Sequence, residues 1–72
     1  MPFVIKWIPQ DASATVVDRH VFERLRDALE HAGAVLGERP TDVWIEDEAG
    51  QRVAYQDRIV EYERRRIRPD RK

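Results

Sequence analysis

The chain contains no cysteine, and this absence excludes several kinds of chemistry. Neither a disulfide nor a zinc site held by thiolates can form. The lack of cysteine also fits a reducing cytoplasm. With 72 residues, the chain has room for one domain and one small core. Such a core supplies only about 3–5 kcal/mol of net stability, so we expect tight packing or self-association to reinforce the fold.

Glycine and serine are also scarce. The three glycines stand far apart in the sequence, so there is no glycine-rich loop to cradle a phosphate. The one serine, Ser13, falls in an expected turn. His31 and Asp27 have helical spacing, but no nucleophile accompanies them. We therefore expect a non-enzymatic protein with no catalytic residue and no cofactor.

Long hydrophobic runs are missing as well. The first apolar run, Phe3 to Ile5, is interrupted by Lys6. No stretch approaches the roughly 18 apolar residues of a membrane span. No basic segment followed by a long apolar one marks a signal peptide. The expectation is a cytoplasmic protein that does not bind membranes.

Charge is present in quantity but unevenly placed. Residues 1–60 carry seven basic and eleven acidic side chains, a net charge of −4, whereas residues 61–72 carry six and three, a net charge of +3. We divide the chain into an α+β domain over 1–63 and a basic tail over 64–72. The candidate phosphate contacts of the tail are Arg64, Arg65, Arg66, Arg68, Arg71 and Lys72.

The N-terminal third begins with a strand. Apolar side chains alternate over 3–8, and Pro9 ends the run. Two interpretations of the next segment remain open. Thr15 and Asp18 could form a capping box that opens a long helix. Alternatively, β-branched and aromatic residues favour a second strand over 14–22, which we prefer, with the helix beginning near Glu23.

A helix is predicted over 24–36. Its apolar stripe is formed by Leu25, Ala28, Leu29, Ala32, Val35 and Leu36. Gly37 is a natural stop, and Pro40 prevents continuation. Gly33 weakens the last turns by roughly 1 kcal/mol relative to alanine.

A hairpin is predicted over 42–55. Its three-residue loop, Glu48 to Gly50, suits a type I turn followed by a bulge with Gly50 in the left-handed region. That register pairs Ile45 with Val53 and Val43 with Tyr55 on one face. It sets Glu46 opposite Arg52 on the other face.

After the hairpin, Asp57 is a good N-cap for a short C-terminal helix over 59–64. We expect residues 66–72 to be frayed. The fold class is α+β: a small antiparallel sheet of about four strands in the order ββαββ, one long helix on one face, and the short C-terminal helix. If the capping box forms, the order is βαββ with three strands.

This layout resembles that of short bacterial proteins of unknown function, in which one hairpin precedes a helix and another follows it. Two strings carry the resemblance over about residues 3–60: Phe22-x-x-Leu25-x-x-Ala28-Leu29-x-x-Ala32 and Val43-Trp-Ile-Glu-Asp-x-x-Gly50. The resemblance implies the ββαββ order and no activity, cofactor or catalytic residue. The chain departs from it at Glu23, where a Ser, Thr or Asp N-cap is expected.

No metal site is expected. Glu46 and Asp47 are neighbours on a strand, so their carboxylates point to opposite faces and cannot converge on one ion. His20 and His31 are eleven residues apart and match no metal-binding spacing. With His20 on a strand and His31 on the wet face of the helix, the two need not meet.

The tryptophans are the main candidates for an interaction surface. Trp44 points to the sheet face opposite to that of its neighbours Val43 and Ile45. It would therefore lie on an open sheet face unless the C-terminal helix covers it. Together with Trp7 and Ile8 it would form an apolar patch, which often marks an interface. The expected function is a protein–protein interaction module that binds an unknown protein or forms a homodimer. The alternative is a nucleic-acid-binding protein that uses the arginine-rich end.

Overall fold

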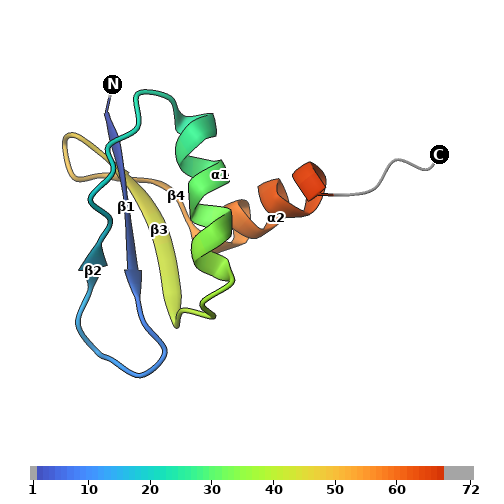
Figure 1. Cartoon of the computed structure of the whole chain (residues 1–72). Coiled ribbons are helices and arrows are strands. Elements are labelled where there is room, and N and C mark those ends of the chain that lie inside the picture. The colour runs from blue at the N-terminus through green and yellow to red at the C-terminus, as the bar shows by residue number, and fades with distance from the viewer. Residues whose placement is uncertain (1, 68–72) are drawn as a thin grey trace.

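The computed structural model describes residues 2–67. Along the chain the elements are β1 (Phe3–Ile8), β2 (Val16–Val17), α1 (Leu25–Leu36), β3 (Asp42–Asp47), β4 (Arg52–Ala54) and α2 (Gln56–Ile67). The strands form one antiparallel sheet in the order β2-β1-β3-β4, as Figure 1 shows. The expected α+β class and the ββαββ order are confirmed. No helix within 2–67 is both long and apolar enough to cross a membrane.

Both helices share one core with one face of the sheet. The helix α1 packs against β1 and β3, and α2 packs beside α1 (Figure 1). Fully buried side chains come from each layer: Ile5, Val43 and Ile45 from the sheet, and Ile59 from α2. From α1, Ala28 and Ala32 are fully buried, and their small side chains let the helix approach the sheet closely. The stripe predicted for α1 is thus the face that packs on the sheet.

The strand interpretation of 14–22 is correct in kind but too long. Only Val16 and Val17 form a strand, pairing with Trp7 and Lys6 of β1. After Val17 the Asp18 carboxylate accepts a hydrogen bond from the His20 backbone N–H, at 2.8 Å, and the pairing with β1 returns only as a single bridge between Phe22 and Phe3.

The turn of the second hairpin forms as predicted. Gly50 has φ of 84°, and its N–H bonds the carbonyl of Asp47 at 3.0 Å. Glu46 pairs with Arg52, also as predicted. The predicted pairing of Ile45 with Val53 is wrong, because the register shifts between Ile45 and Glu46 and Ile45 pairs with Ala54. The buried methyl of Ala54 leaves room for α2 to lie close to the sheet.

The helix ends differ from the expectations. Gly37 has φ of −64°, so the left-handed residue after α1 is Arg39, with φ of 56°. The helix α2 begins at Gln56, which places Asp57 inside the first turn instead of at the N-cap. The helix also runs to Ile67, so the expected boundary between residues 63 and 64 falls within a helix. The expected fraying of 66–72 is wrong for Arg66 and Ile67, which belong to this helix, and residues 68–72 lie outside the described residues.

Candidate functional site

Trp44 lies on the sheet face that carries no helix, yet it is only 4% exposed. In β1–β3 pairing it lies opposite Lys6, on the face opposite to buried Ile5 and Ile45. Its cover is the guanidinium of Arg52, whose Cζ lies 4.1 Å from the ring centroid. The expectation of an exposed Trp44 is therefore wrong, and so is the alternative that the C-terminal helix covers it.

Glu46 completes this covered network. One carboxylate oxygen accepts the Trp44 indole N–H at 2.7 Å, and the other lies 2.8 Å from Lys6 Nζ. The bond from Lys6 and then the bond from Trp44 lower the pKa of Glu46 below its ordinary value of 4.5. The polar groups around the Trp44 ring are therefore paired, although the same face also carries Val17, which lies opposite Lys6 and is 53% exposed.

Trp7 does not share the face of Trp44, whereas Ile8 does. Trp7 is paired with Val43 on the helix-covered face, where it is half-buried against the core. Ile8 alternates to the other face, and it is also half-buried. Trp7 instead lines a separate hollow beside the β1–β2 loop, where Asp11 and Glu38 contribute acidic groups. The predicted three-residue surface is therefore split between two faces.

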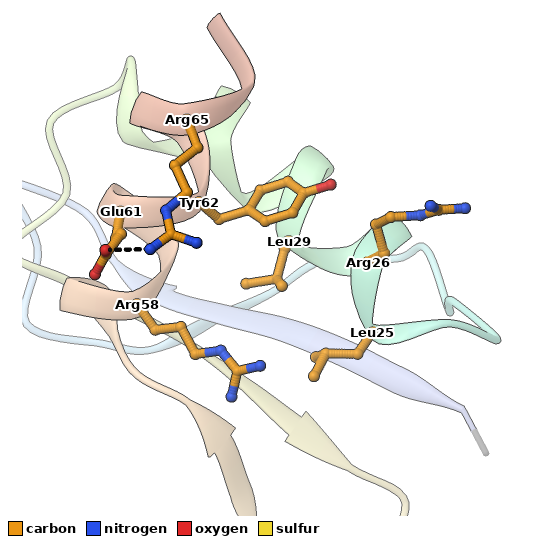
Figure 2. A pocket seen from close by; sticks show the side chains of 7 residues that line it. All are labelled: Leu25, Arg26, Leu29, Arg58, Glu61, Tyr62 and Arg65. Atoms are coloured by element: carbon orange, nitrogen blue, oxygen red, sulfur yellow. Dashed lines mark hydrogen bonds and ion pairs between the residues drawn. The ribbon is translucent and has the colours of Figure 1, made fainter. Parts of the chain in front are cut away.

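A groove between α1 and α2 is the better candidate surface. It has a volume of about 520 Å³. Figure 2 shows Leu25 and Leu29 projecting from α1 toward α2, while the Tyr62 ring reaches back from α2 toward α1. The polar side chains around this apolar floor are Arg26, Arg58, Glu61 and Arg65. The groove thus combines an apolar floor with a charged rim.

The rim of the groove is positive. Among the described residues, three arginines and one glutamate line the groove, and Arg65 is neutralised by Glu61 at 3.0 Å. The Arg26 side chain points away from α2 (Figure 2). Within residues 2–67, no carboxylate forms an ion pair with Arg26 or Arg58. An arginine without an ion-pair partner remains available to an incoming anionic group.

The predicted phosphate contacts are only partly visible. Arg64 and Arg65 are exposed on α2, but Arg64 borders a different hollow beside Asp57 and Val60. The side chain of Arg66, and all of Arg68, Arg71 and Lys72, lie outside the part that can be described. The charge pattern along the chain indicated a tail of arginines and did not indicate the groove. A signal was available, because Arg58, Tyr62 and Arg65 have the spacing of one helix face.

The two histidines, whose sequence positions did not require them to meet, lie together beside Asp18. The carboxylate of Asp18 contacts His20 Nδ1 at 2.8 Å and His31 Nε2 at 3.0 Å. The two imidazole centroids are 5.0 Å apart. Burial alone would raise the pKa of Asp18, but the hydrogen bonds from His20 and His31 outweigh it and leave this pKa below its ordinary value of 3.8.

No family model, curated protein or solved structure matches the chain. The function must accordingly be argued from the surface geometry and its charges.

Proposed function

We propose that this protein is a small interaction module that binds an acidic, amphipathic segment of a partner protein in the groove between α1 and α2. The observation that carries the proposal is the apolar floor of Leu25, Leu29 and Tyr62 beneath a net positive rim. Apolar side chains of a partner would enter the groove, and its carboxylates would meet the arginines. Binding of an amphipathic helix in a groove is a common form of peptide recognition.

The construction of the groove supports this role. Its two walls are helices, and both are anchored through buried residues: Leu29 is 5% exposed and Ile59 is fully buried. Fixed walls lower the entropic cost of binding, because little of the surface must be ordered when a partner arrives. The rim arginines are exposed, so their contribution falls as salt screens it.

A titration with synthetic peptides tests the proposal. The probe is a helical peptide with leucines on one face and glutamates on the other, and its control has lysine in place of glutamate. Isothermal titration calorimetry at low salt should give binding to the acidic peptide only, and added salt should weaken it. Binding of both peptides with equal affinity would contradict the charge complementarity.

Charge reversal identifies the surface. Arg58→Glu should weaken binding of the acidic peptide about tenfold or more, because it replaces an attraction for the glutamates of the peptide with a repulsion. Arg64→Glu is the matched control, since it makes the same charge change on the same helix but outside the groove. Equal losses in both variants would mean that net charge alone drives binding, which overturns the proposal.

Nucleic acid is the competing partner, and exposed Arg64 and Arg65 are the described residues that favour it. Single- and double-stranded RNA and DNA should therefore be titrated under the same low-salt conditions. Nucleic-acid binding that exceeds peptide binding and survives Arg58→Glu would replace the proposal. Sedimentation tests the homodimer: a dimer that dissociates in Arg58→Glu would make a second copy the occupant of the groove.

A further inference from the structure

Three metal-ligating side chains from two distant parts of the chain converge beside α1. Asp18 and His20 come from the loop after β2, and His31 comes from α1. One ligand atom from each lies within 4.8 Å of the other two. This cluster is separate from the groove, whose α1 residues are Leu25, Arg26 and Leu29.

The loop that carries two of these ligands is fastened to β1 at both ends. The Asp18 N–H donates to the Ile5 carbonyl at 2.9 Å. Phe22 and Phe3 exchange two backbone hydrogen bonds, at 2.7 and 2.9 Å. Asp18 and His20 thus belong to a segment that is already fixed to β1 in the folded protein. Metal binding would therefore cost little additional conformational entropy.

An aromatic neighbour restricts the imidazoles further. The Phe22 ring centroid lies 5.2 Å from that of His31 and 6.1 Å from that of His20. Phe22 is itself half-buried against the core. This packing restricts the His31 ring in particular, whereas His20 is held mainly by its hydrogen bond to Asp18.

We propose that Asp18, His20 and His31 form a binding site for a divalent transition-metal cation, with Zn²⁺ as the best-matched ion. Two imidazoles and one carboxylate are a ligand set that suits zinc and its first-row neighbours. In a tetrahedral zinc site with bonds of about 2.0–2.1 Å, ligand atoms lie roughly 3.3 Å apart. The present contacts of 2.8 and 3.0 Å, one to each Asp18 oxygen, would need to widen slightly. The ligand atoms lie within 4.8 Å of one another, so binding would also draw the two imidazole nitrogens around a shared ion.

The degree of burial indicates what kind of site this is. The Asp18 side chain is 11% exposed, that of His31 36% and that of His20 68%. One side of the cluster is therefore held against the protein while the His20 side faces solvent. Three protein ligands with an accessible side leave a coordination position for water or for a ligand atom from a partner.

Calorimetry on the full chain tests the site. The chain is freed of any histidine tag, stripped with a chelator and titrated with Zn²⁺. We expect one equivalent to bind and, at a hundredfold excess over the Kd, the Tm to rise by roughly 10 °C or more. Absence of both heat and a Tm shift at millimolar Zn²⁺ would overturn the proposal and leave the cluster as a hydrogen-bonded clamp.

Substitutions assign the ligands. Loss of one ligand, in His20→Ala or Asp18→Asn, should weaken Zn²⁺ binding at least tenfold. Asp27→Asn is the matched control, because Asp27 lies in the first turn of α1 and is not a member of the cluster. Equal affinity in the wild type and both ligand variants would contradict the assignment.

A spectroscopic measurement is independent of any loss of folding. Long-range ¹H–¹⁵N correlation spectra of the imidazoles on the intact wild-type chain identify which ring nitrogen binds Zn²⁺. The geometry requires Nδ1 of His20 and Nε2 of His31. Metal shifts on the opposite nitrogens, or on one histidine only, would reject the three-ligand site.

Discussion

The Arg52 guanidinium lies over the Trp44 ring, with 4.1 Å between Cζ and the ring centroid, and the same arginine lies 5.9 Å from the centroid of Tyr55. Within residues 2–67, no helix packs on this face of the sheet, and the Arg52 side chain is what lies over the Trp44 ring instead. It shields Trp44 from water while remaining exposed itself. This relationship explains why the tryptophan on the open face is not an apolar docking patch.

Arg52→Ala should expose Trp44. We expect a red shift of tryptophan emission, stronger quenching by acrylamide, and a loss of about 0.5–1 kcal/mol in the free energy of unfolding. The measurement is made in a Trp7→Phe background, where Trp44 is the remaining tryptophan. Arg19→Ala, in the loop after β2, is the control. Unchanged emission in Arg52→Ala would show that other groups bury the ring.

Glu46 should make stability depend on pH. The pKa of Glu46 is lowered in the folded state. The ionised carboxylate therefore adds its full contribution to the free energy of unfolding above pH 4.5, and this contribution is lost as the pH falls through the lower folded pKa. Glu46→Gln should therefore cost about 1–2 kcal/mol at pH 7 and progressively less below pH 4.5. Urea denaturation at several pH values measures both. A constant difference between pH 7 and pH 3 would contradict the role of the charge.

Gly50→Ala should destabilise the protein by about 1–2 kcal/mol, because φ of 84° is costly for a residue with a Cβ. The cost is one of backbone conformation, since no heavy atom beyond the two neighbouring residues lies within 4 Å of the site where the Cβ would stand. Ala49→Gly, in the same loop, is the control, and chemical denaturation is the measurement. Equal stability of the wild type and Gly50→Ala would mean that the turn adopts another conformation.

Ile59 is the main anchor of α2 and therefore of one groove wall. Ile59→Ala should cost roughly 2–5 kcal/mol, which is comparable to the whole stability of so small a domain. Ile59→Val removes one methylene group and should cost about 0.5–1.5 kcal/mol, which leaves a folded chain to measure. Val60→Ala tests the neighbouring half-buried position. A larger loss at Val60 than at Ile59 would reverse the assigned packing of α2.

The elements and their order could be predicted because their signals are local. Gly50 marked the bulged turn through its backbone preference, and alternation of apolar residues marked β1. The register beyond Glu46 could not be predicted in the same way. The choice between Val53 and Ala54 opposite Ile45 depends on how closely α2 approaches, which is a property of the assembled layers.

The candidate sites were harder to predict than the fold for a related reason. The face of Trp44 followed from strand alternation, but its cover depends on the side-chain conformation of Arg52. Asp18 and His31 are thirteen residues apart and meet only because the loop after β2 is fastened to β1. Neither contact has a signature in the spacing of residues along the chain.

The most direct test of the central claim, that the groove is the interaction surface, is a map of amide chemical shifts in ¹H–¹⁵N spectra during titration with the acidic amphipathic peptide. We predict saturable changes that cluster on the groove residues of α1 and α2: Leu25, Arg26, Leu29, Arg58, Glu61, Tyr62 and Arg65. Changes centred on the sheet face around Trp44, or on the hollow beside Trp7, would contradict the account and move the binding surface there.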